Sequence, residues 1–271
     1  MSRSVFVSLL LGAVLAMPPV ASIAQEPAVP DMPEPQREDL SFKVRPGVAI
    51  DVRNPYGDVN VRFGGYVHDF DMHTTLQQPA GAARIEMRPA ERDGRFVVEP
   101  RLPDGVVLAE GQRLDLVLYV PQDHALSVRT EFGTIDSRNT KSAIRLSSKT
   151  GNIFVRGNEG PVVAESDEGN VSANLTSAAP RGSRQRFASR TGRVSVEVID
   201  NMDVEVLLAS STPIATDFSL QVEHLDGREP NKRARAVVGR PGEGKDKAEM
   251  TIESLAGDIR LSRRAVFVDP E

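Results

Sequence analysis

The chain has no cysteine and no tryptophan among its 271 residues. Without cysteine it cannot form disulfides, thiolate zinc sites, iron–sulfur clusters or a thiol nucleophile, so burial and hydrogen bonding must hold the fold together. Aromatic residues make up only 5%, which argues against a groove lined with rings for sugars or bases. A basic excess is also missing, since 33 Lys and Arg face 38 Asp and Glu, and this net charge of −5 disfavours nucleic acid as a partner.

Helical patterning is scarce too. After the first 24 residues, no segment combines apolar side chains at a 3.6-residue spacing with capping residues, and none approaches the roughly 18 apolar residues of a membrane span. The 39% hydrophobic and 26% charged content excludes both a membrane bundle and a disordered chain. The scarcity of helical patterning in a chain of globular composition predicts an all-β protein.

Residues 1–24 have the layout of a secretory signal peptide. Arg3 precedes an apolar run from Val5 to Met17, prolines end the run, and Ser22 and Ala24 supply the small residues of a cleavage site. We therefore expect an exported protein that is periplasmic, displayed on the outer surface or secreted. Residues 25–40 carry four prolines and five acidic residues, which predicts an irregular leader before a domain at 41–264 and a tail at 265–271.

A repeated pattern around six glycines dominates this domain. Apolar residues stand mostly at seven and five positions before each glycine and at two and four after it, while a small polar residue stands three before. Such period-2 alternation on both sides predicts two short strands that meet at a glycine corner, where φ is positive or another backbone comes close. The predicted corners are Gly57, Gly133, Gly151, Gly169, Gly192 and Gly257.

Two architectures can use such a unit, a string of hairpins or a β-solenoid of stacked coils. The equal spacing of 18 residues between Gly133, Gly151 and Gly169 favours the β-solenoid, because stacking requires a constant coil length. The small polar residues should then form a ladder beside the corner. A further coil around Thr212 lacks the glycine and should be distorted or lie at an edge.

Two long segments interrupt the repeat. Residues 62–125 contain alternating stretches that predict antiparallel strands, with Asp93-Gly94 as a hairpin turn, and these strands should cap one end of the stack as the tail caps the other. Residues 217–248 form a polar, Gly- and Lys-rich stretch that predicts a loop.

The repeat resembles that of the DUF4097 adhesin-like family of exported bacterial proteins. The family's unit, Gly-Asp-[Ile/Val]-x-[Val/Leu] after small polar residues, is matched by the segments 54–61, 148–155 and 254–261. The likeness covers about residues 42–263, with Thr212-Pro213 and the residues Glu168 and Arg193 departing from the pattern. It implies an all-β, helix-like stack in the cell envelope or outside the cell, and it brings no catalytic residues with it.

Asp69, Asp71 and His73 are the candidate metal ligands. On a strand these three side chains share one face, and two carboxylates with an imidazole suit a divalent ion. The alternative is that Phe70 and Met72 face the core while the polar residues simply face water.

Two motifs suggest catalysis or nucleotide binding. Glu165, Asp167 and Glu168 could supply a general acid and base on a β-helix surface, as in glycoside hydrolysis, although outward carboxylates usually serve solubility. The stretch 239–245 matches the start of a phosphate loop, but Asp246 stands where a Ser or Thr hydroxyl is needed and no amphipathic helix follows, which favours a solvated loop.

Basic residues at outward positions form a candidate polymer-binding face for an anionic envelope polysaccharide or another surface protein. The alternative is that they keep a flat sheet soluble. The residues are Arg129, Arg145, Lys149, Arg156, Arg190 and Arg193.

The sequence thus predicts a non-enzymatic protein without cofactors that presents an extended β surface for adhesion or as a scaffold. Two alternatives stay open, a carbohydrate-active β-helix enzyme and a metal- or small-ligand-binding module.

Overall fold

A computed structural model describes residues 33–65 and 69–264. Strands build nearly all of this part, and its single helix is a three-residue 3-10 turn, η1 at Gly244–Asp246. The described part is therefore all-β, as the sequence predicts. The predicted signal peptide, most of the leader and the tail lie outside it.

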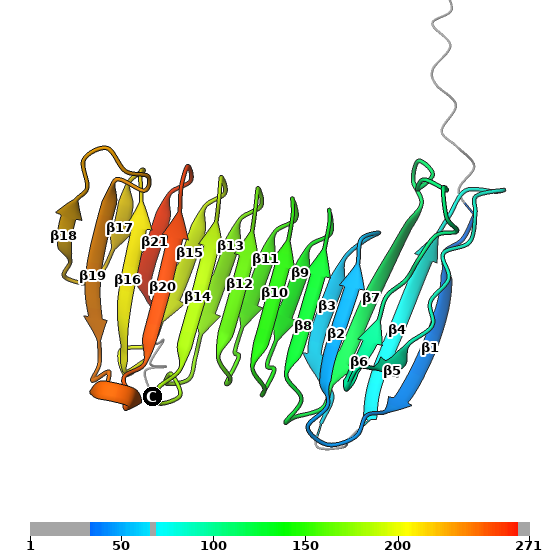
Figure 1. The fold of residues 1–271 in the computed structure, drawn as a ribbon, viewed down its shortest axis with the longest axis horizontal. Helices are drawn as coiled ribbons and strands as arrows, with labels where there is room; N and C mark the ends of the chain where they lie inside the picture. The colour runs from blue at the N-terminus through cyan, green and yellow to red at the C-terminus, as the bar shows by residue number, and fades with distance from the viewer. Residues whose placement is uncertain (1–32, 66–68, 265–271) are drawn as a thin grey trace, which may run out of the picture. The chain divides into compact units, whose positions relative to one another are not determined.

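The strands form two large mixed sheets (Figure 1). Sheet A has ten strands, in the spatial order β1 (Gln36–Lys43), β4 (Asp69–Gln77), β7 (Arg113–Val120), β3 (Val59–Phe63), β9 (Ile135–Arg138), β11 (Ile153–Arg156), β13 (Val171–Leu175), β15 (Val194–Val198), β21 (Ile259–Arg263) and β17 (Ile214–Thr216). Sheet B has eleven, in the order β18 (Gln221–His224), β19 (Lys232–Val238), β16 (Val204–Ser210), β20 (Glu249–Ser254), β14 (Arg184–Ser189), β12 (Val162–Ser166), β10 (Ile144–Ser148), β8 (Leu126–Thr130), β2 (Ala49–Asn54), β6 (Arg95–Val98) and β5 (Ala90–Arg92).

From β8 to β15 the chain alternates strictly between the two sheets. Each sheet B strand leads through a corner into a sheet A strand, and the next coil repeats the path beside it. Neighbouring strands pair in parallel without slippage, so that Ile144 lies between Leu126 and Val162. A slip of one residue would turn every apolar side chain toward solvent, and this fixes the register.

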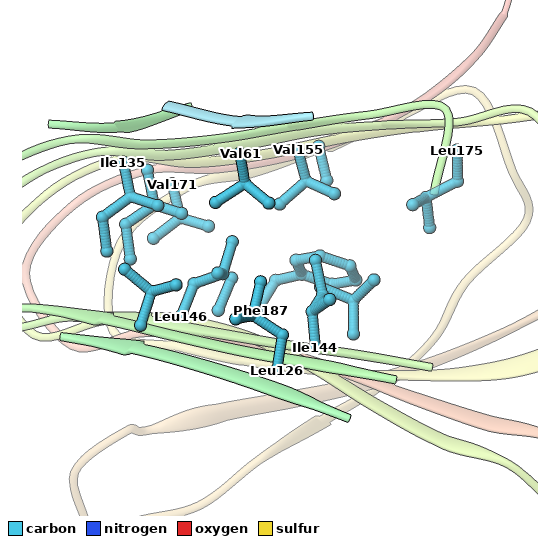
Figure 2. Packing of buried hydrophobic residues seen from close by; sticks show 14 of the residues in the cluster. Val61, Leu126, Ile135, Ile144, Leu146, Val155, Val171, Leu175 and Phe187 are labelled. Carbon is cyan, nitrogen blue, oxygen red and sulfur yellow. The ribbon is translucent and has the colours of Figure 1, made fainter. Parts of the chain in front are cut away.

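The apolar positions of the repeat form the core between the sheets. Figure 2 shows Ile135, Val155 and Val171 from sheet A facing Leu146 and Phe187 from sheet B. All five side chains are fully buried. The alternation of the sequence therefore corresponds to one inward and one outward face on each strand.

The six repeat glycines follow one another in a column at the corners. A Cβ placed on Gly151 would lie 2.0 Å from the carbonyl oxygen of Gly133, and a Cβ on Gly169 would lie 2.1 Å from that of Gly151. None of the six has a positive φ. Of the two reasons for glycine that the sequence allows, close approach of a neighbouring backbone is therefore the one that applies.

The small polar residues three positions before each glycine form a buried ladder that links the coils. Ser189 accepts a hydrogen bond from the backbone N–H of Gly192 at 2.8 Å and donates one to the carbonyl of Gly169 in the preceding coil at 2.8 Å. Ser166 and Ser254 make the same pair of bonds with their own corner glycine and with the glycine beside it. Each hydroxyl thus satisfies one donor and one acceptor that the glycine corner leaves free.

The segment 62–125 extends both sheets at one end of the described stack. β4 pairs antiparallel with β1 and β7, and β5 forms with β6 the predicted two-residue hairpin at Asp93-Gly94. β1 begins at Gln36, inside the segment expected to be an irregular leader. No proline follows Pro35 before Lys43, so the backbone there is free to pair with β4 along its whole length.

The other end departs from sequence order. The last coil, β20 and β21, lies between the coil of β14 and β15 and the coil of β16 and β17. β17 is consequently the edge of sheet A, as expected for the Thr212 coil, and the Thr212 hydroxyl donates a 2.7 Å bond to the carbonyl of Gly257. The loop predicted at 217–248 is wrong in part, because β18 and β19 form an antiparallel pair that continues sheet B. Short buried alanines on the inner face of β19 hide this strand from a search for large apolar residues.

Replacement of Gly151 by alanine should destabilise the protein by about 4 kcal/mol or more, since its Cβ would overlap a backbone carbonyl that cannot move away. Urea unfolding measures the change. Gly81→Ala is the control, because Gly81 has a φ of +80° but nothing within 4 Å of its Cβ position, so only about 1–2 kcal/mol of backbone strain is expected. Equal losses in the two variants would contradict the close-approach explanation.

Ser189→Ala should cost about 1–3 kcal/mol, because it removes both bonds of one buried ladder hydroxyl. The matched control is Ser147→Ala, which changes an outward hydroxyl on the same sheet and should stay within about 0.5 kcal/mol. If the ladder did not stabilise the fold, the Ser189→Ala and Ser147→Ala variants would have the same free energy of unfolding.

Candidate functional site

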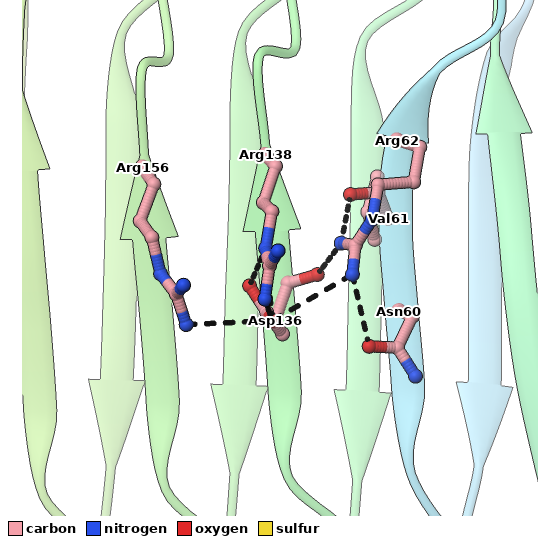
Figure 3. A network of polar contacts seen from close by, with 6 residues as sticks. All are labelled: Asn60, Val61, Arg62, Asp136, Arg138 and Arg156. Atoms are coloured by element: carbon pink, nitrogen blue, oxygen red, sulfur yellow. Dashed lines mark hydrogen bonds and ion pairs between the residues drawn. The ribbon is translucent and has the colours of Figure 1, made fainter.

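Three arginines stand side by side on the outer face of sheet A (Figure 3). Arg62 is the last residue of β3 that pairs with β9, where Arg138 lies opposite it, and Arg156 lies opposite Arg138 on β11. Adjacent strands are about 4.8 Å apart, so the three cations emerge from the sheet at that spacing. We call these residues the arginine row.

One carboxylate, that of Asp136, serves all three guanidinium groups. Arg138 approaches an oxygen of Asp136 at 2.7 Å, Arg156 at 3.5 Å and Arg62 at 3.6 Å. The Asp136 side chain is only 13% exposed, so its ion pairs are partly shielded from water. The hydrogen bond and the charge of Asp136 together raise the pKa of Arg138.

Arg62 is held in place by the backbone as well. Its Nη1 donates to the carbonyls of Val61 and Asp136, both at 2.8 Å, and its Nη2 donates to the side-chain oxygen of Asn60 at 3.2 Å. Burial lowers the pKa of Arg62; Asp136 opposes this effect and the charges of Arg138 and Arg156 add to it. The guanidinium is therefore held in place at a partly buried position, where its charge is less favoured than in water.

The arginine row with Asp136 carries a surplus of two positive charges. Like charges on directly opposite residues of neighbouring strands destabilise a sheet. The three guanidinium groups therefore repel one another, and one of them is also half-buried. An anion bound beside them would reduce this electrostatic repulsion. The net charge of the chain is negative, so the positive surplus is a property of this patch and not of the protein as a whole.

A depression of about 320 Å³ adjoins the row on the same face of sheet A. Arg156 and Phe154 form the side next to the row, and Ser172 and Ser195 lie on the following strands. Short hydroxyl side chains leave this part of the sheet low, which explains the hollow. We call it the serine groove.

The six basic residues predicted as one binding face lie on two. Only Arg156 of sheet A and Arg193, in the corner before β15, belong to the side of the arginine row. Arg129 and Arg145 project from sheet B, and Lys149 and Arg190 occupy corners that follow its strands. The single basic face is therefore wrong, because residues before and after a corner glycine emerge from opposite sheets.

Carboxylates accompany most of these predicted residues. Arg145 lies 3.8 Å from Glu165, Lys149 3.9 Å from Glu131, and Arg190 4.0 Å from Glu168. In the described part of the chain, Arg129 and Arg193 have no ion pair.

The candidate metal ligands Asp69, Asp71 and His73 do share the outward face of β4. The His73 ring lies against Tyr119, and its Nδ1 is 2.5 Å from a carboxylate oxygen of Asp39 on β1. Within residues 33–65 and 69–264, no three His, Asp or Glu side chains are arranged to hold a metal ion.

Two of the three acidic residues considered for catalysis, Glu165 and Asp167, help to line a depression of about 500 Å³ on sheet B, and Glu168 does not. Glu165 accepts a 2.8 Å bond from Arg186, and Glu253 lies 2.9 Å from the same guanidinium. Burial acts to lower the pKa of Arg186, but its bonds to the two carboxylates outweigh burial and raise it. Among the described residues that line this depression, Glu165 and Glu253 are therefore both bound to the same arginine.

The stretch that matches a phosphate loop, 239–245, connects β19 to β20 and contains η1 instead of a long helix. Asp203 accepts a hydrogen bond from the backbone N–H of Arg240 at 2.8 Å. Its carboxylate therefore occupies a donor that a phosphate would need.

Sequence reasoning missed Arg62 and Arg138. Each arginine of the row stands five positions after a corner glycine, namely Gly57, Gly133 or Gly151. This shared offset was available in the sequence as a signal for three side chains at equivalent outward places.

Comparison with known proteins gives structural neighbours but no family. No family model matches the chain, and no curated protein matches it, so the DUF4097 resemblance stays a prediction. One similar solved structure is a "putative cell adhesion protein" from Clostridium sporogenes, with a TM-score of 0.48 and 14% identity over 84% of this chain and 100% of that one. Another is a "putative adhesin" from Bacteroides fragilis, with a TM-score of 0.35 and 11% identity over 84% of this chain and 97% of that one.

No helix among the described residues has the length and apolar character needed to cross a membrane.

Asp136→Asn should lower the free energy of unfolding by about 1–3 kcal/mol, because three half-screened guanidinium groups lose their shared carboxylate. The loss should shrink in urea titrations at high salt, which screens the remaining repulsion. Asp167→Asn, an exposed corner carboxylate, is the control and should change stability by less than about 0.5 kcal/mol. A salt-independent loss at position 136 would mean that charge crowding is not its cause.

Proposed function

We propose that the protein is a non-enzymatic, exported envelope or secreted protein that binds an anionic polymer through the arginine row. The observation that carries this proposal is the surplus positive charge of three in-line guanidinium groups around Asp136. A polymer suits the site better than a small anion, because the cations repeat from strand to strand in one direction.

The domain serves this function as a β-solenoid that displays its outer surfaces as an adhesin or a scaffold. Support comes from the alternation of the chain between two sheets, from the glycine column and from the coil-to-coil serine ladder. Export follows from the signal-peptide layout of residues 1–24.

The pairing of acidic side chains supports a role without catalysis. Glycoside hydrolysis needs two carboxyl groups that both face the scissile bond of the sugar. Glu165 and Glu253 instead both contact one guanidinium group, that of Arg186.

Binding to polyphosphate and to hyaluronan, two soluble anionic polymers, tests the proposal. A variant with Arg62→Gln, Arg138→Gln and Arg156→Gln should bind both at least about tenfold more weakly than the wild type, and wild-type affinity should fall as salt increases. Asp136→Asn should act in the opposite direction and tighten binding, since it adds to the surplus charge.

The matched control combines Arg129→Gln, Arg145→Gln and Arg190→Gln. It removes the same three charges from the sheet B side and should retain wild-type binding. If both triple variants bind equally more weakly than the wild type, the effect comes from overall charge and not from the arginine row. If the folded wild-type protein binds neither polymer, the proposal is wrong. Circular dichroism checks that each variant is folded.

A further inference from the structure

The arginine row and the serine groove form one continuous track across sheet A. The positions five residues after each corner align from strand to strand, and the pairing continues from Arg156 to Asn174 and from Asn174 to Glu197. From Arg62 to Glu197 the track crosses five strands and measures about 19 Å at about 4.8 Å per strand. It runs across the strands, along the direction in which the coils stack.

The two halves of the track differ in charge. The arginine row is cationic, whereas the groove is lined by the hydroxyls of Ser172 and Ser195, the amide of Asn174 and the carboxylate of Glu197. Asn174 donates a hydrogen bond from Nδ2 to Glu197, and its Oδ1 accepts a 3.4 Å bond from Arg264. Arg156 supplies the cation on the side of the groove next to the row, whereas hydroxyl and amide groups and the carboxylate of Glu197 line the far side, where this carboxylate disfavours an anion.

This combination has a definite chemical complement. Guanidinium groups recognise carboxylate or phosphate, while hydroxyl, amide and carboxylate side chains together recognise a group rich in hydroxyls. The Phe154 ring borders the groove near its cationic end and adds apolar surface there. A uniformly charged polymer would satisfy the row and then meet Glu197, whereas a polymer with alternating charged and neutral sugars can satisfy both halves.

We infer that the ligand is an acidic polysaccharide whose charged sugars bind the arginine row and whose neutral sugars lie in the serine groove. This inference rests on the proposed function and narrows it from any anionic polymer to one class. Hydrogen bonds and charge carry the recognition, in keeping with a chain that has few aromatic residues for stacking.

Two polymers separate anion binding by the arginine row from sugar recognition by the serine groove. Hyaluronan alternates an acidic with a neutral sugar, whereas polyphosphate has no sugar. A variant with Ser172→Val and Ser195→Val removes two of the three serine hydroxyls of the groove, leaving that of Ser262, and adds bulk with side chains that sheets accept well. Hyaluronan should bind this variant at least about fivefold more weakly than the wild type, while polyphosphate binding should change by less than about twofold. Ser147→Val, an outward serine on sheet B, is the matched control and should change neither.

The outcomes distinguish the inference from the function on which it rests. If hyaluronan binds the groove variant as well as it binds the wild type, or if polyphosphate loses as much affinity as hyaluronan, the groove has no role in sugar recognition and the inference is wrong. The arginine row would in that case still bind anionic polymers. If neither polymer binds the folded wild-type protein, the function itself fails.

Discussion

The close approach of backbones at the glycine corners is the constraint on which the rest of this structure depends. From Gly133 to Gly257, a Cβ at each corner would lie 1.8–2.2 Å from the carbonyl oxygen of the glycine beside it, and a Cβ on Gly57 would lie 2.3 Å from that of Leu114. The coils can therefore stack in register only where the side chain is absent. The buried hydroxyl three positions earlier then bridges the same two corners. Spacing, register and the alignment of the apolar core all follow from these two contacts, without disulfides.

Stacking in register has a consequence for the outer faces. Residues at the same offset from successive corners become direct neighbours, and their side chains stand about 4.8 Å apart. On sheet B the rows mix arginines with carboxylates, as around Glu165 and Arg186. On sheet A the same geometry brings Arg62, Arg138 and Arg156 together around a single carboxylate. The repeat therefore aligns the outward positions of neighbouring strands, and the residues at these positions determine whether a given row is neutral or charged.

Much of the fold could be predicted from the sequence. The all-β class, the alternation between faces, the serine positions, the hairpin at Asp93-Gly94 and the edge position of the Thr212 coil in sheet A are local consequences of spacing and turn chemistry. In sheet B the same coil is not at the edge, because β19 pairs with β16. The candidate site could be predicted only in part. The sequence predicts Arg156 but places it on one face with sheet B residues, because the side of a residue depends on which strand of the coil carries it.

The sequence by itself determined the local structure of each coil, two short strands that meet at a glycine corner, because the period of two and the corner depend only on residues close together in the chain. Only the tertiary structure decided which coils are neighbours. Residues 249–263 enter between two earlier coils, and Arg62 meets Arg138 across 76 positions because the intervening segment folds away into strands of its own. These pairings join equivalent edges of similar strands, and no local signal in the chain specifies which equivalent edge is chosen.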